Sequence, residues 1–183
     1  MKIYVDSDSF LKQMREIVLR AAIKRNLDIT FVADRSLKDV VLAKERHTAQ
    51  LRASKLSKNS DYNKEEIKNI RSKIKMIVVK SDSDSADDKI VEIAQKGDLA
   101  ITHDIPLIDR LCEKGVLVLD DRGNIFSDKN IKERLSIRNA MTELRSYGIY
   151  VEKNKKMGAK DVKLFSDAFS KTLDKYKKEL GQN

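Results

Sequence analysis

The chain has little of what marks a secreted or membrane-spanning protein. Its 183 residues include no Trp, one Pro and one Cys. The single Cys112 excludes an internal disulfide, which fits a reducing compartment. No apolar run approaches the ~20 residues of a membrane-spanning helix. Residues 1–10 also lack the apolar stretch of a signal peptide. We therefore expect a cytoplasmic protein with no membrane partner.

Positive charge is concentrated in two segments of the chain. Residues 35–75 carry 12 Lys or Arg and 5 Asp or Glu, a net +7, and residues 151–183 carry 9 and 5, a net +4. The remainder is slightly acidic at −2, which leaves the whole chain at +9. Two basic segments on a slightly acidic body suit a polyanion such as nucleic acid. A solvated surface rich in lysine explains the same pattern equally well.

Five short apolar runs predict the strands of a parallel sheet. They lie at residues 2–5, 29–33, 76–80, 99–102 and 116–119. Apolar residues are nearly continuous in each run, as in parallel strands that are buried on both faces. Helical segments separate the runs, and two more follow at about 130–146 and 160–179, which we expect to pack on the sheet. The fold class is therefore α/β, an open parallel sheet of about five strands with helices on both faces, in one domain over residues 1–183.

The segment 36–75 is too long for one helix that connects two parallel strands. Apolar residues at helical spacing predict a long helix from Leu37 to Leu56, a polar break, and a second helix around Ile67 and Ile70. We interpret residues 36–75 as a basic helical arm inserted between the second and third strands. Such an arm could contact a substrate or join two copies of the chain into a homo-oligomer.

Acidic residues follow two of the predicted strands, at the edge where open parallel sheets bind ligands. Asp6 and Asp8 follow the first strand, and Asp104 follows the fourth. Asp87 lies in the first turn of a predicted helix on its inward stripe, whereas Asp88 faces outward. Ser85 and Asp88 form the capping-box pattern that begins this helix.

Carboxylates collected at one sheet edge raise one another's pKa unless a cation neutralises them. Oxygen ligands without a Cys or His cluster suit Mg²⁺ or Mn²⁺, either of which could support phosphodiester hydrolysis. Simpler interpretations exist for single residues. Asp104 precedes Pro106 and could cap a helix, and Asp87 could complement a helix dipole. A second group of acidic residues is interpreted as solvated turn residues: Asp82, Asp84, Asp120 and Asp121.

Four linked motifs lie in and around the predicted sheet: MKIYVDSDS, SADDKIVEIAQKGDLAITHDIPLIDRL, DDRGNIF and NIKERLSIRNAMTELRSYG. Together they resemble the bacterial YaiI/YqxD family of PIN-like proteins. The resemblance covers about 1–34 and 76–175 and implies a three-layer PIN-like fold. It also implies that the acidic site of PIN nucleases corresponds to Asp6, Asp8, Asp87 and Asp104, as catalytic residues and as ligands for Mg²⁺ or Mn²⁺. The family has no settled substrate.

The resemblance also suggests substrate contacts. Arg134, Arg138 and Arg145 match the family's pattern, and they could reach a phosphate or pair with helix carboxylates. We add Thr102, at the end of the fourth predicted strand. His103 departs from the family, which usually has Gln at this position.

The sequence leaves three functions open. The first is a metal-dependent nuclease acting on nucleic acid, with RNA favoured over DNA. The second is a haloacid-dehalogenase-type phosphatase with Asp6 as nucleophile and Asp8 as acid and base. The helix that begins almost at once after Ser9 leaves no room for the flap of that fold. The third is a catalytically silent module that binds nucleic acid or a protein.

Overall fold

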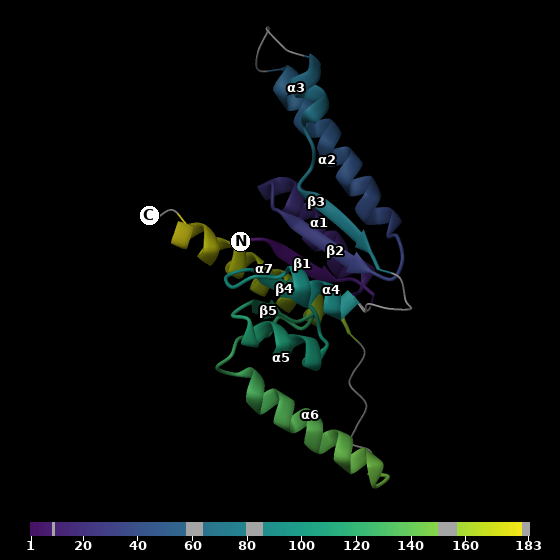
Figure 1. The fold of residues 1–183 in the computed structure, drawn as a ribbon, viewed down its shortest axis with the longest axis vertical. Helices are drawn as coiled ribbons and strands as arrows, with labels where there is room; N and C mark the ends of the chain where they lie inside the picture. The colour runs from purple at the N-terminus through teal and green to yellow at the C-terminus, as the bar shows by residue number, and fades with distance from the viewer. Residues whose placement is uncertain (9, 58–63, 80–85, 150–156, 181–183) are drawn as a thin grey trace.

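A single open sheet forms the centre of the molecule (Figure 1). The computed structural model describes residues 1–8, 10–57, 64–79, 86–149 and 157–180. The strands are β1 (Ile3–Asp6), β2 (Ile29–Ala33), β3 (Ile74–Val78), β4 (Leu99–Ile101), β5 (Leu117–Leu119) and β6 (Ile125–Phe126). Their order across the sheet is β3-β2-β1-β4-β5-β6, and only the pair β5 and β6 is antiparallel. The α/β class and the parallel sheet are confirmed, and β6 is a sixth strand that the sequence did not predict.

Helices cover both faces of this sheet. They are α1 (Lys12–Arg25), α2 (Lys38–Leu56), α3 (Lys64–Asn69), α4 (Ala86–Ile93), α5 (Ile105–Glu113), α6 (Ile131–Ser146) and α7 (Ala159–Leu180). The core on one face includes residues of α1, the beginning of α2 and α7, and the core on the other face includes residues of α4 and α5. This arrangement fits a three-layer PIN-like fold. No helix in the described ranges is long and apolar enough to cross a membrane.

The alternation of side chains along the central strand β1 determines on which face of the sheet Asp6 lies. Ile3 and Val5 lie in the core beneath α1 and α7, whereas Tyr4 lies in the core beneath α4 and α5. Successive side chains of a strand alternate between faces, so Asp6 points to the same face as Tyr4. By the same alternation in β4, Thr102 follows Ile101 onto the face of Ala100. The sheet therefore directs Asp6 and Thr102 toward the layer of α4 and α5.

The segment between β2 and β3 forms the two helices that the sequence predicts, and part of it belongs to the core. Val40 near the start of α2 is fully buried, and His47 is 3% exposed. The Nδ1 atom of His47 lies 2.9 Å from the Ser72 hydroxyl, just before β3. Farther along α2, the Arg52 guanidinium donates to the carbonyl of Lys68 at 3.0 Å. The described part of the arm is thus attached at its base, and its outer part extends from the sheet beside β3 (Figure 1).

The two helices that follow the sheet differ from each other. Phe165, Phe169 and Leu173 of α7 enter the core, as predicted. On α6 only Ile131 is buried, and Ile137 is 44% exposed. Figure 1 shows α6 beneath α5 and away from the strands. The prediction that α6 packs on the sheet is therefore wrong beyond its first turn.

Candidate active site

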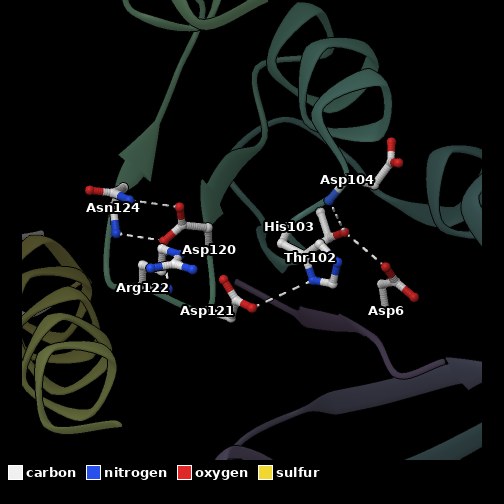
Figure 2. Close-up of polar contacts among 8 residues, drawn as sticks. All are labelled: Asp6, Thr102, His103, Asp104, Asp120, Asp121, Arg122 and Asn124. Atoms are coloured by element: carbon white, nitrogen blue, oxygen red, sulfur yellow. Dashed lines mark hydrogen bonds and ion pairs between the residues drawn. The ribbon is translucent and has the colours of Figure 1, made fainter. Parts of the chain in front are cut away.

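We call the carboxyl edge of the sheet near Asp6, Asp8, Asp87 and Asp104 the acidic edge. Asp6 and Thr102 form its centre. β1 and β4 are parallel neighbours, so their carboxyl ends meet. The Thr102 hydroxyl donates a 2.8 Å hydrogen bond to Oδ2 of Asp6 (Figure 2). Both residues are buried, with exposed fractions of 2% for Thr102 and 6% for Asp6. Burial raises the pKa of Asp6, and the hydrogen bond from Thr102 opposes that shift.

Asp104 is a helix cap as well as a member of this edge. Its carboxylate Oδ1 accepts the backbone N–H of Leu107 at 2.9 Å, at the start of α5. Its own backbone N–H donates to the Thr102 hydroxyl at 3.1 Å. In Figure 2 its carboxylate points away from that of Asp6. The simpler interpretation of Asp104 as a helix cap therefore holds, and one carboxylate oxygen is engaged in that role.

Asp87 lies in the first turn of α4 and interacts electrostatically with the same edge. Its pKa is raised to about 6, first by burial and then by the negative charges of Asp6 and Asp104. The next residue, Asp88, is exposed and pairs with Arg110 at 2.8 Å. The structure thus brings Asp6, Asp87 and Asp104 within electrostatic range of one another. Ser85, the proposed start of this helix, lies outside the described residues.

Asp8 points to a neighbouring position at the end of β2. Its two carboxylate oxygens accept the backbone N–H of Asp34 at 2.9 and 3.1 Å. Partial desolvation raises the pKa of Asp8, the hydrogen bond from the Asp34 N–H opposes the shift, and the charges of Asp34 and Asp6 add to it. Asp8 is exposed at the surface, unlike Asp6. It therefore lies at the outer side of the acidic edge, with Asp34 as a partner that the sequence reasoning did not name.

The pair of His103 and Asp121 was also missed. Nδ1 of His103 lies 3.6 Å from Oδ2 of Asp121 (Figure 2). The two residues follow β4 and β5, which are adjacent and parallel, so the rule that found Asp6 and Asp104 could have found this pair. Burial raises the pKa of Asp121, and the interaction with His103 opposes the shift.

The neighbouring Asp120 is a structural residue. It is 7% exposed, and its carboxylate accepts the backbone N–H groups of Arg122 at 2.9 Å and Asn124 at 2.8 Å. The interpretation of Asp120 as a solvated turn residue is therefore wrong, because this side chain holds the turn between β5 and β6. Asp82 and Asp84 lie outside the described residues.

The three predicted arginines lie on α6. Arg134, Arg138 and Arg145 are all exposed. Their positions are four and seven residues apart, which puts them on one side of the helix. None pairs with a carboxylate within the ranges that the structure describes. Arg134 also lines a cavity, beside the turn that Asp120 holds.

The acidic edge has the carboxylate oxygens that Mg²⁺ and Mn²⁺ prefer as ligands. In the part of the chain that the structure describes, these oxygens do not form a complete set of ligands around one position. Across the described residues, no three side chains of His, Cys, Asp or Glu are grouped closely enough to hold an ion together. Mg²⁺ keeps several waters and often uses only one or two carboxylates, so a complete protein cage is not required. A cation would also relieve the repulsion that contributes to the raised pKa of Asp87. Asp6 and Asp87 are two carboxylates of this edge that could contact such an ion.

The sheet, its two helical layers and its acidic edge define an α/β protein with a PIN-like layout. A profile described as the uncharacterised YaiI/YqxD family matches residues 61–175. The chain belongs to this family. A UPF0178 protein of Pseudomonas entomophila is 32% identical over 97% of this chain and 99% of its own length. A UPF0178 protein of Pseudomonas aeruginosa is 31% identical over 98% of this chain and 94% of its own length. No solved structure matches the chain.

Proposed function

We propose that this protein is a metal-dependent nuclease that hydrolyses phosphodiester bonds, with RNA favoured over DNA. One observation carries the proposal: Asp6, Asp87 and Asp104 come from three separate segments and influence one another at the carboxyl edge of the sheet. Carboxylates that repel one another in a half-buried site are typical of a site that binds a cation.

Each residue has a distinct role in this proposal. Asp6 and Asp87 would hold Mg²⁺ or Mn²⁺, which activates water and stabilises the leaving oxygen when it is bound. Thr102 orients the Asp6 carboxylate through its 2.8 Å hydrogen bond. Asp104 fixes the start of α5, and its negative charge favours a cation nearby. Asp8 supplements this charge from the outer side of the edge.

The phosphatase alternative is less well supported. In that reading Asp6 would attack phosphorus, and a flap would follow the strand. Here α1 begins at Lys12, only six residues after Asp6.

The binding module has more support, because Arg134, Arg138 and Arg145 present guanidinium groups without a carboxylate partner in the described ranges. A protein that only binds would not depend on Asp6.

The direct experiment measures cleavage of labelled single-stranded RNA and DNA with Mg²⁺, with Mn²⁺ and with a chelator. We expect metal-dependent cleavage, faster on RNA, that falls about a hundredfold or more in Asp6→Asn. Asn has the same shape and still accepts the Thr102 hydrogen bond, so the fold should persist. Asp88→Asn is the matched control, because Asp88 is exposed and pairs with Arg110. Equal cleavage by Asp6→Asn and the unaltered protein would disprove the assignment.

A second prediction needs no substrate. The Asp87 carboxyl should titrate at about 6, above its ordinary value of 3.8, in a carbon-detected NMR titration. The raised pKa means that this group favours the folded state while it is protonated. Its contribution to stability is therefore lost as the pH rises from 3.8 to about 6. Asp6→Asn removes a negative charge and should lower the midpoint, and added Mg²⁺ should lower it as well. If neither Asp6→Asn nor added Mg²⁺ changed the titration midpoint of Asp87, the proposed interaction of Asp87 with Asp6 and a metal ion would be contradicted.

A further inference from the structure

A cavity lies beside the turn between β5 and β6, and the nuclease site does not account for it. Its volume is about 660 Å³. Its lining residues are Gly123, Asn124, Ile125, Phe126, Asn130 and Arg134. We call it the hairpin cavity. Its volume lies within the range of sites that hold small organic ligands.

Arg134 supplies this cavity with a cationic group that has no partner in the described parts of the chain. Two residues earlier, Lys132 is engaged by Asp109 at 3.3 Å and Glu113 at 3.1 Å. The contrast is informative, because both side chains project from the first turn of the same helix. A guanidinium with unused donors binds phosphate in a bidentate manner. The hairpin cavity therefore has a suitable group for a phosphate.

The residues of the turn that line the hairpin cavity offer an acceptor and some apolar surface. The Asn124 amide donates through Nδ2 to Oδ2 of Asp120 at 2.7 Å, which fixes its orientation. Its oxygen points away from Asp120 (Figure 2) and can accept a hydrogen bond from a base. Ile125 supplies the apolar surface, because it is 42% exposed, whereas Phe126 is only 7% exposed and belongs mainly to the core. A planar base with N–H groups fits this lining better than a simple anion does.

The hairpin cavity is connected to the acidic edge by a row of polar residues. Asn124 bonds Asp120, and the next residue, Asp121, lies 3.6 Å from His103. His103 in turn follows Thr102, which bonds Asp6. Figure 2 shows these side chains in one row along the ends of the strands. A strand with its reactive phosphate near Asp6 could thus place another nucleotide in the hairpin cavity.

We propose that the hairpin cavity is a nucleotide subsite, which receives one base of the bound strand and holds an adjacent phosphate on Arg134. This inference rests on the proposed nuclease function and adds a substrate position to it. The Asp120 carboxylate does not oppose the anion strongly, because it already accepts three N–H groups from Arg122 and Asn124.

The test uses a short single-stranded RNA and adenosine 5′-monophosphate, both with a chelator so that no cleavage occurs. Amide NMR spectra and fluorescence anisotropy are recorded for the unaltered protein, Arg134→Gln and Lys129→Gln. Lys129 is the matched control because it is exposed, lies just before α6 and does not line the cavity. We expect ligand-induced shifts at Gly123, Asn124 and Asn130. Arg134→Gln should weaken binding about tenfold, and Lys129→Gln should weaken it less than about threefold.

Two results would overturn the subsite: equal weakening by both variants, or shifts that avoid the hairpin cavity. Because no cleavage is needed, this failure is separate from that of the nuclease proposal. If Asp6→Asn cleaves normally while the shifts appear at Gly123 and Asn124, the nuclease site is wrong and the subsite stands.

Discussion

The helices α6 and α7 both carry several apolar residues and both follow the last strand, yet α7 packs into the core along its length and α6 only at its first turn. Phe165, Phe169 and Leu173 of α7 are exposed by 0%, 2% and 4%. On α6, Ile131 is buried and the remaining apolar residues are half-buried or exposed. The difference shows that the number of apolar residues in a helix does not decide whether it packs.

The angular position of the apolar residues around the helix axis decides whether the helix packs into the core. The three buried residues of α7 are four positions apart, so they form one continuous stripe. On α6, Ile131 and Leu135 are also four apart, but Leu144 follows Leu135 by nine positions. Nine residues are about two and a half turns, so Leu144 lies on the opposite side of the helix from Leu135. One helix therefore has a single apolar face, and the other has two short ones.

The largest expected effect is that of Phe165→Ala on α7. The Phe165 ring packs edge-on against Phe10 with a centroid separation of 5.5 Å and stacks on Phe169 at 5.9 Å. Removal of this fully buried ring should lower the free energy of unfolding by about 3–5 kcal/mol. Urea denaturation followed by circular dichroism measures the change. A loss below about 1 kcal/mol would mean that α7 does not complete the core.

An intermediate effect is expected for Gly123→Ala, where α7 approaches the turn between β5 and β6. Gly123 has a φ of +84°, and an added Cβ would lie 2.8 Å from the carbonyl oxygen of Leu164. Gly148 at the end of α6 is the matched control, since its φ is +77° and nothing lies within 4 Å of the added atom. Gly148→Ala should cost about 1 kcal/mol from backbone strain alone. Gly123→Ala should cost about 1–3 kcal/mol more, in the same denaturation assay. Equal losses would indicate that α7 can move away from the turn.

The smallest effect is expected for Leu144→Ala on α6. Leu144 is only half-buried and belongs to neither of the two core clusters of the described structure. The free energy of unfolding should fall by less than about 1 kcal/mol. Amide exchange should also be faster in α6 than in α7. A loss comparable to that of Phe165→Ala would show that α6 is covered in solution.

Most of the fold follows from sequence patterns, and the exceptions have physical reasons. The five predicted strands lie within two residues of the observed ones, because buried parallel strands are almost continuously apolar. β6 was missed because it has only Ile125 and Phe126 and depends on pairing with β5. The packing of α6 differs from the expectation because its apolar residues do not lie on one side of the helix.

The sequence predicts several residues of the acidic edge, but not Asp34 or the pair of His103 and Asp121, and it predicts less of the edge's geometry. The rule that strand ends meet identified Asp6 and Asp104, and the helical stripe distinguished Asp87 from Asp88. The engagement of the Asp104 carboxylate by the Leu107 N–H depends on a side-chain orientation that spacing does not specify. The function of these residues stays a prediction until cleavage is measured.

The order of the strands also affects how the protein behaves at high concentration. β3 and β6 are the outer strands, and unpaired backbone groups on such strands can recruit another chain and begin aggregation. On β3, Lys75 keeps a charged, exposed side chain that a second strand would have to bury. On the other side, β6 has only two residues and offers almost no backbone to extend. Both outer strands thus carry a feature that disfavours the addition of a foreign strand.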